Sequence, residues 1–401
     1  MTYLAAQHHG TKLSANIVRS IEHFEAMRDE WNALFEKACN PSPPLHFDWV
    51  SNWLSVHQGR FVRCDDGLRI ICCRREGALV AVLPLYLREA MRISDGGRHL
   101  RFISTGEYER DEICPDYLDL LSFQETREQC VELAWSQLCQ NLDRSYDRLE
   151  LSDIPHDSQF VTWARENGAA HDLQIVPRGT CPIADLNGGF DKYLSRLSAN
   201  TRQQIRRLLR AATQAGVVCE SAQTPAQAHA FFDEMVQLHQ RRWEAAGQPG
   251  CFSSQTFTRF HRQLIDMWLP SGKVVLTRIR CGKTTLAVKY GFLIGSKFDF
   301  YQSGVRLDED CPIRSPGIVS FMLLMQHLIS RGVVTFDFLR GSSNYKQRLA
   351  TTAEPLVMVR RVRWTLGTTM GFVVDLGARG IRRAGRLAIG RGVVSARADS
   401  R

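Results

Sequence analysis

The chain of 401 residues lacks a hydrophobic run long enough to cross a membrane. Its longest apolar stretch, residues 78–87, is interrupted by Pro84 and is far shorter than the roughly 20 residues that a membrane-spanning helix needs. The first residues also lack a charged segment followed by an apolar one, so no secretory signal is expected. We therefore expect a cytoplasmic protein, with peripheral contact at the inner membrane surface as a further option.

The sequence also lacks the cysteine and histidine spacings of metal sites and disulfide frameworks. Its 12 cysteines are scattered without a CxxC pair, and its 12 histidines form no HExxH motif. Reduced and mostly buried thiols, with no bound metal, are therefore expected. No cysteine lies in a setting that predicts an activated thiolate, so the sequence does not assign one to catalysis.

What the chain does have is an excess of positive charge, +9 at pH 7. Such a charge favours anionic partners, namely CoA, nucleotide sugars, RNA or acidic lipid. Arg202, Arg206 and Arg210 follow i, i+4 spacing and form a stripe on one helix face, although a solvated basic face is the alternative. The glycine- and arginine-rich residues 366–401 predict either interfacial membrane contact or disorder.

Hydrophobic periodicity divides most of the chain into two similar units. Each has helices, then antiparallel strands, then a helix and a further strand. This order is typical of an α/β (α+β) fold with mixed central sheets flanked by helices. The predicted boundaries are residues 1–19 for an N-terminal extension, 20–178 for the first unit, 179–365 for the second unit and 366–401 for the tail.

The strongest local patterns predict individual helices and strands. They are helices over 20–38, 190–215, 254–269 and 316–330, and strands over 116–121, 273–280, 284–295, 297–305, 333–339 and 356–364. The helix that begins at Pro316 follows Ser315, and proline is well suited to the first helical position.

Motifs in the second unit resemble a known family. The segments "LHQRRWEAAG" (238–247) and "YGF…FYQSG…SPG…DFLRG…YK" (in order over 290–346) are similar to GNAT-type acyltransferases of the CelD family. That family is linked to cellulose and exopolysaccharide synthesis and is distantly related to the FemAB peptidyltransferases. The resemblance covers most of residues 20–365. It implies two tandem GNAT-like domains, of which the second keeps the better-preserved active site.

The resemblance implies that an acyl group moves from acetyl-CoA or a longer acyl-CoA to an amine or hydroxyl of an envelope polysaccharide, sugar or lipid precursor, without a metal. In such folds the acyl carrier lies between two strands that part, here 297–305 and 333–339, and Tyr301 and Ser303 would face it. The carrier's pyrophosphate would meet free N–H groups at the start of the helix between them. The residues implied there are Arg314, Ser315, Gly317 and Ile318. Acetyl-CoA-binding relatives usually have two glycines at this helix start and this chain has one, so another acyl carrier stays open.

Four residues fit the steps of acyl transfer in this comparison. Asp337 would accept a proton or orient the acceptor, Tyr345 would protonate the leaving thiolate, and Lys346 would stabilise the oxyanion or contact phosphate. His239 is the candidate general base because histidine titrates near neutral pH. A purely structural alternative for Asp337 is a turn cap that pairs with Arg340 or Lys346.

The acceptor is expected to bind beside these groups. Arg242 lies three residues after His239 on the same helical face, and Arg340 with Gly341 would let the chain turn close to the substrate. The acceptor-binding candidates from the first unit are Asp116, Tyr117 and Asp119.

Three other functions stay open at this stage. One is FemAB-like aminoacyl transfer from tRNA to a cell-wall precursor, in which the arginine stripe would contact tRNA; the leading interpretation needs no nucleic acid. The second is long-chain N-acylation of a sphingoid-type amine, with the basic tail at the membrane. The third is a non-catalytic GNAT scaffold that binds a polysaccharide synthase or a regulatory lipid.

Overall fold

The computed structural model describes residues 13–57, 67–89, 97–308, 310–341 and 343–363. The basic tail, residues 366–401, lies outside the described residues, and so does the membrane contact predicted for it. Among the described residues, no helix is both long enough and apolar enough to span a membrane.

The first unit contains a four-stranded sheet and part of a ten-stranded one. Its elements are β1 (Leu13–Val18), α1 (Ile21–Glu25), α2 (Arg28–Lys37), α3 (Phe47–His57), β2 (Ile70–Arg75), β3 (Ala78–Leu83), β4 (Leu85–Arg88), β5 (His99–Phe102), β6 (Leu121–Ser122), α4 (Arg127–Ser136), β7 (Arg148–Pro155) and α5 (Gln159–Asn167). The predicted helix over 20–38 is therefore two helices.

Two predictions for this unit are wrong. The predicted N-terminal extension, residues 1–19, contains β1, which pairs antiparallel with β2 and alternates between half-buried and exposed residues. The predicted strand over 116–121 is reduced to its end, β6. Cys114 and Tyr117 have positive φ angles of 50° and 66°, a left-handed conformation that a strand does not accommodate.

The second unit agrees with the predicted helices and hairpins, except that the helix predicted over 190–215 is divided into two at Leu197 and Ser198. Its elements are β8 (Gln174–Asp185), α6 (Phe190–Arg196), α7 (Ala199–Gln214), β9 (Val217–Ser221), α8 (Pro225–Ala245), α9 (Gln255–Trp268), β10 (Val274–Cys281), β11 (Thr284–Ile294), β12 (Lys297–Val305), α10 (Pro316–Ile329), β13 (Thr335–Asp337), α11 (Asn344–Leu349) and β14 (Thr352–Val362). Local signals explain this agreement: Ser254 accepts a hydrogen bond from the Phe257 N–H at the start of α9, and Pro316 opens α10.

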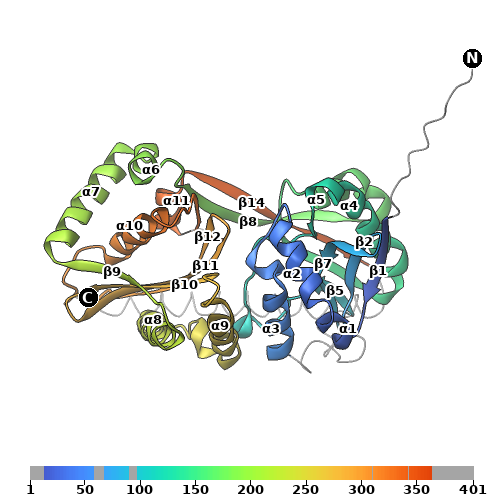
Figure 1. Cartoon of the computed structure of the whole chain (residues 1–401), viewed down its shortest axis with the longest axis horizontal. Coiled ribbons are helices and arrows are strands. Elements are labelled where there is room, and N and C mark those ends of the chain that lie inside the picture. The colour runs from blue at the N-terminus through green and yellow to red at the C-terminus, as the bar shows by residue number, and fades with distance from the viewer. Residues whose placement is uncertain (1–12, 58–66, 90–96, 309, 342, 364–401) are drawn as a thin grey trace, which may run out of the picture.

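One continuous sheet joins the two units. Its strand order is β4-β5-β7-β14-β8-β13-β12-β11-β10-β9. The long strands β8 and β14 pair with each other, β14 also pairs with β7 of the first unit, and β8 also pairs with β13 of the second. Figure 1 shows β8 and β14 crossing from one half of the molecule to the other. The strand that we predicted at the end of the second unit, β14, therefore also pairs with a strand of the first unit.

Helices from the two units also pack against each other. The Asn52 side-chain amide of α3 donates to the Phe260 carbonyl of α9 at 2.9 Å. Beside this contact, Trp49 meets Phe260 edge to face, with ring centroids 5.0 Å apart. The largest apolar core thus contains side chains from both halves.

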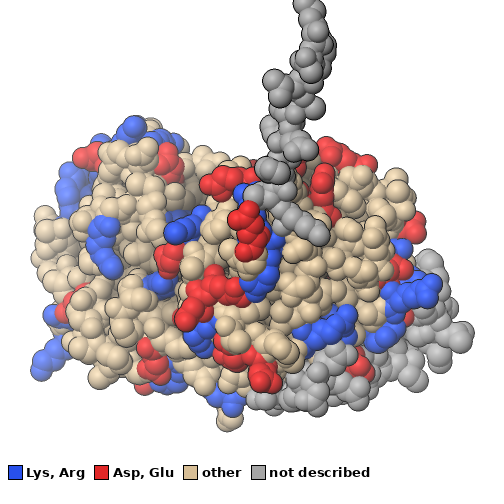
Figure 2. Space-filling view, turned by 45° about the vertical axis from the view of Figure 1, so that its right-hand side comes forward, with Lys and Arg blue, Asp and Glu red and all other residues tan. Residues whose placement is uncertain are grey.

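The arginine stripe lies on α7, where Arg206 and Arg210 are exposed and Arg202 is half-buried. Apolar residues Ile205 and Leu208 of the same helix are buried. Figure 2 shows basic and acidic side chains interspersed over the face that it presents, rather than gathered in one large basic patch.

Candidate active site

Strands β12 and β13 begin side by side and then part. They pair in parallel only from Lys297 opposite Thr335 to Asp299 opposite Asp337. Beyond this point β12 continues toward Val305 without β13 beside it, still paired with β11 and with an irregular register at Tyr301. The predicted separation of these two strands is confirmed.

A cavity of about 250 Å³ occupies the gap. It is lined by side chains from both units: Glu112, Cys114, Asp116, Cys251, Phe257, Tyr301, Gln302, Phe338, Leu339, Arg340 and Lys346. A second cavity, of about 940 Å³, shares Glu112, Cys114, Cys251 and Gln302 with the first and is also lined by His239. The two cavities therefore meet at these four residues, two from the first unit and two from the second.

Tyr301 lines the gap as predicted for a carrier-facing residue. Its hydroxyl donates to the Ile113 carbonyl of the first unit and lies 3.2 Å from His261 Nε2. Ser303, predicted to face the carrier as well, pairs with Lys289 of β11 and is not among the residues that line the 250 Å³ cavity. Tyr301 and Ser303 thus have different surroundings.

Lys346 reaches the gap from α11. Its Nζ donates to the carbonyls of Leu339 at 3.1 Å and Arg340 at 2.9 Å, and burial lowers the pKa of this amine. Gly341, with φ 147°, leaves room for it, because a Cβ there would lie 2.9 Å from Lys346 Nζ. Gly341, which we expected to leave room for the substrate, therefore leaves room for the Lys346 side chain.

Asp116 and Arg340, both predicted to bind substrate, bind each other across the two units. Asp116 Oδ2 accepts from the Arg340 N–H at 2.8 Å, and its Oδ1 lies 3.4 Å from Arg340 Nε. Arg340 also donates to Asp153, and burial raises the pKa of Asp116 to about 6. This pair closes one wall of the gap.

Asp337 and Tyr345 do not form the predicted carboxylate–phenol pair. Asp337 is fully buried and bonded to Lys297 Nζ at 2.9 Å, the Tyr117 hydroxyl at 2.5 Å and the Leu339 N–H at 2.7 Å. Tyr345 instead stacks on Phe321 of α10, with ring centroids 5.3 Å apart. Successive strand residues point to opposite faces, so Asp337 lies away from the Phe336 and Phe338 rings that pack toward α10.

In this arrangement Asp337 caps the turn that follows it, as its structural alternative supposed, through the Leu339 N–H. It contacts neither Arg340 nor Lys346, the partners considered for its structural alternative, and its oxygens are already occupied by donors. Tyr117, predicted to bind the acceptor, is one of those donors, and its ring lies 3.7 Å beneath Lys297 Nζ. Both residues therefore belong to a buried ionic cluster that joins the units.

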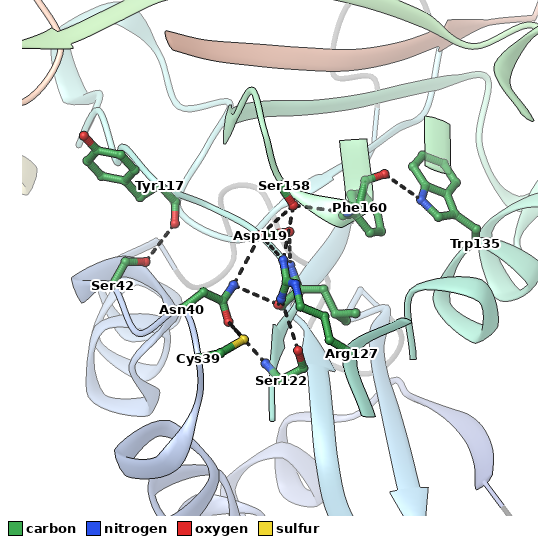
Figure 3. A network of polar contacts seen from close by, with 11 residues as sticks. Cys39, Asn40, Ser42, Tyr117, Asp119, Ser122, Arg127, Trp135, Ser158 and Phe160 are labelled. Atoms are coloured by element: carbon green, nitrogen blue, oxygen red, sulfur yellow. Dashed lines mark hydrogen bonds and ion pairs between the residues drawn. The ribbon is translucent and has the colours of Figure 1, made fainter. Parts of the chain in front are cut away.

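Asp119 lies in a separate polar network inside the first unit. Its Oδ2 accepts hydrogen bonds from Arg127 at 2.5 Å, Ser158 at 2.8 Å and Asn40 at 3.3 Å. Figure 3 shows these groups converging on Asp119, while the Tyr117 side chain points away from them. Asp119 lines none of the cavities described above, so the structure does not place it with the acceptor-binding candidates.

The start of α10 is open, as the prediction of a carrier site requires. Ser315 adopts a left-handed conformation with φ 54°, is exposed and forms no side-chain cap. Arg314 is exposed beside it, and a Cβ at Gly317 would have only Val305 nearby, at 3.8 Å. Ile318 donates its N–H to the Ser315 carbonyl at 3.0 Å, so its amide is already used within the turn.

His239 and Arg242 differ in burial and in contact with the cavity. His239 is buried and lines the 940 Å³ cavity, and burial lowers its pKa so that the imidazole is neutral near pH 7. Arg242, near the end of α8, is exposed. Of this predicted pair, only the histidine lines the cavity.

Sequence reasoning missed several residues at these cavities, among them Glu112 and Cys114, which line all three of the cavities described in this subsection. Cys251 and Gln302 lie where two cavities meet, and Glu107 lines a third cavity of about 380 Å³. Burial raises the pKa of Glu107 to about 8. The expectation of mostly buried thiols was also wrong: among the described cysteines, all free, only Cys72, Cys73, Cys130 and Cys181 are buried. No sequence motif marks Cys251, because its neighbours come from α8 and β12.

Residues 199–347 match the family model described as acetyltransferase (GNAT) domain. Two solved structures share the overall fold. FemX is 11% identical in sequence, with a TM-score of 0.56, and the superposed region covers 82% of this chain and 95% of the FemX chain. L-PGS from Bacillus licheniformis is 13% identical, with a TM-score of 0.51, and the superposed region covers 89% of this chain and 97% of the L-PGS chain. No curated protein sequence matches the chain.

The second unit therefore has a GNAT acyltransferase fold, and the parted strands lie inside the matched residues. The predicted fold class, mixed central sheets flanked by helices, is confirmed, while the GNAT-like character of the first unit stays a prediction. Assignment to the CelD family and the relation to FemAB proteins stay predictions. Within the described residues, no group of three or more His, Cys, Asp or Glu side chains is placed to hold a metal ion.

Proposed function

We propose that this protein transfers an acyl group from acetyl-CoA or a longer acyl-CoA to an amine or hydroxyl of an envelope polysaccharide, sugar or lipid precursor. The observation that carries the proposal is the gap between β12 and β13, which opens after three paired residues into two connected cavities. The match of residues 199–347 to the GNAT domain supports acyl transfer at this gap. Membership of the CelD family is part of the same proposal.

The carrier would enter between the parted strands from the start of α10. Arg314 and the N–H groups of Ser315 and Gly317 would meet its phosphates, because a helix start attracts anions, whereas the Ile318 N–H already bonds to the Ser315 carbonyl. The exposed, uncapped Ser315 supports this assignment. Tyr301 would contact the acyl end, since its ring lines the gap.

Three side chains would then serve the chemistry. His239, neutral and buried in the larger cavity, would take the proton of the acceptor. Lys346 would stabilise the oxyanion: a protonated amine has three N–H donors, and two of them go to backbone carbonyls. Burial raises the pKa of Tyr345, which keeps its phenol protonated as a general acid for the leaving thiolate.

Binding and turnover test this proposal. Acetyl-CoA, octanoyl-CoA, palmitoyl-CoA and free CoA are screened by thermal shift, where a carrier at 100 times its Kd stabilises by about 2.7 kcal/mol. Release of free thiol is then followed with glucosamine or sphinganine as acceptor. Arg314→Ala weakens CoA binding, whereas Arg331→Ala, beyond the other end of α10, does not. Absence of a shift with every CoA species would exclude CoA as the carrier.

Aminoacyl transfer from tRNA is the second candidate, and the arginine stripe on α7 favours it. A stripe that served tRNA would make activity depend on RNA. Turnover that survives ribonuclease, and persists after Arg206→Ala and Arg210→Ala, would exclude this candidate.

The same assays distinguish the two remaining alternatives from the main proposal. Long-chain N-acylation predicts turnover of palmitoyl-CoA with sphinganine that falls when residues 366–401 are deleted. A non-catalytic scaffold predicts that CoA species bind while no acceptor produces free thiol.

A further inference from the structure

Cys251 lies at the junction of the two cavities, with a histidine and one side-chain amide beside its sulfur. Its Sγ is 3.7 Å from His239 Nε2 and 3.4 Å from the side-chain nitrogen of Gln302. The cysteine is half-buried and lines both cavities, so its sulfur borders the carrier gap and the larger cavity.

Neighbouring bonds fix the direction of each contact. The Gln240 side-chain nitrogen donates to the Pro249 carbonyl at 2.7 Å, which leaves Gln240 Oε1 to accept from His239 Nδ1 at 3.1 Å. Nδ1 therefore carries the proton of the neutral imidazole, and Nε2 is the acceptor that faces the Cys251 thiol. The chain Cys251–His239–Gln240 thus runs from nucleophile to base to orienting group.

The Gln302 amide is oriented in the same way. Its Oε1 accepts from the Ser303 N–H at 2.9 Å, so its nitrogen faces the Cys251 sulfur. An amide donor at this place stabilises a forming thiolate and is close enough to reach an oxyanion on a carbon bonded to the sulfur.

Gly250 permits this close approach. Its φ is 66°, and a Cβ there would lie 2.4 Å from Gln240 Oε1 and 3.2 Å from His239 Cε1. A side chain at this position would therefore displace both the base and the group that orients it.

We propose that Cys251 accepts the acyl group from the carrier as an enzyme-bound thioester and then passes it to the acceptor, with His239 moving the protons. The proposal rests on the acyl transfer proposed above and replaces its direct step by two. Burial raises the pKa of Cys251 to about 12 and lowers that of His239, so the resting pair is a neutral thiol and a neutral imidazole. Proton transfer to His239 accompanies attack, as in a serine–histidine pair.

Each step balances. The Cys251 S–H proton goes to His239 Nε2 while the sulfur bonds to the acyl carbon. The carbon–sulfur bond to the carrier then breaks, and the carrier thiolate takes the proton from His239. In the second step the acceptor nitrogen or oxygen attacks the Cys251 thioester and gives its proton to His239. The Cys251 thiolate leaves and regains the proton.

Isotope exchange without an acceptor tests the proposal. A thioester intermediate lets the wild-type protein move label from tritiated CoA into acetyl-CoA or octanoyl-CoA, and leaves one acyl group on Cys251 that neutral hydroxylamine removes. Cys251→Ala loses the bound acyl group and slows exchange at least about 100-fold. The control Cys39→Ala, which removes an exposed thiol away from both cavities, keeps both properties.

The outcomes separate the two proposals. If Cys251→Ala still releases free thiol with an acceptor at the wild-type rate, the intermediate is ruled out while acyl transfer stands. If Cys39 carries as much acyl group as Cys251, the labelling is non-enzymatic and the intermediate is again ruled out. If no CoA species shifts the melting temperature of the wild type, acyl-CoA transfer fails and the intermediate fails with it.

Discussion

Lys289 of β11 is enclosed by aromatic rings between the central sheet and α10. Its Nζ lies 3.6 Å from the centre of the Phe321 ring and 5.3 Å from that of Phe300, and the side chain is almost fully buried. Burial, with a smaller contribution from the charge of Arg242, lowers the pKa of this amine from 10.5 to about 7. The folded protein therefore holds a lysine that is partly neutral at physiological pH.

This lysine should make stability depend on pH. Between pH 7 and about 10 the unfolded chain binds the proton that the folded chain has released, so the free energy of unfolding rises with pH, by an upper limit on the order of 5 kcal/mol. Lys289→Met removes this slope and raises the urea midpoint more at pH 6.5 than at pH 9.5. Exposed Lys283→Met is the control. Equal slopes in wild type and Lys289→Met would contradict the prediction.

We expect Asp337 to contribute to the stability of the fold rather than directly to catalysis. Asp337→Asn breaks a buried ion pair with Lys297, and such a loss costs about 3–5 kcal/mol. Asp308→Asn, at an exposed ion pair with Arg306, changes the free energy of unfolding by less than about 1 kcal/mol. Urea titration of both variants checks this. A wild-type midpoint for Asp337→Asn would show that the cluster does not stabilise the fold.

At the scale of elements, the contact between α8 and β12 positions His239. Gly304 of β12 touches the helix so closely that a Cβ there would lie 2.4 Å from the Met235 carbonyl and 2.7 Å from Leu238 Cβ. The helix carries His239 directly after Leu238, so its distance from the strand sets the place of the imidazole.

Gly304→Ala should therefore impair both stability and turnover. The added methyl group pushes α8 outward, which costs about 1–3 kcal/mol, and moves His239 away from Cys251. Gly317→Ala is the matched control for stability, because its Cβ would meet only Val305 at 3.8 Å. Thermal melts compare the two. Equal melting temperatures for both variants would contradict the close approach.

At the scale of the whole molecule, strands β8 and β14 tie the units into one sheet. Buried ionic contacts reinforce the tie, since Tyr117 bonds to Asp337 and Asp116 to Arg340. The gap needs both units as well, because Cys114 and Asp116 line it from the first. Neither half has a complete site without the other.

The two halves should therefore unfold together. Hydrogen exchange of peptides from β7 in the first unit and β11 in the second, followed by mass spectrometry across a urea series, should give one shared midpoint. A lower midpoint for one of these strands would show that the units unfold independently.

The sequence by itself determined the elements whose signals are local. Helices α9 and α10 and the β10–β11–β12 hairpins were predictable because caps, turns and apolar periodicity act between residues a few positions apart. The parted strands were predictable through the resemblance of the motifs around them. The orientation of Asp337 away from the Phe336 and Phe338 rings was also present in its pattern, since it alternates with them along the strand.

Only the tertiary structure decided how side chains from distant segments meet. The pairing of β14 with β7, the bonds from Tyr117 to Asp337 and from Asp116 to Arg340, and the approach of Cys251 to His239 depend on packing between elements. Hydrophobic burial, which drives that packing, is non-directional, so local sequence signals do not specify which polar groups it brings together. The chemical character of the site therefore follows from the fold.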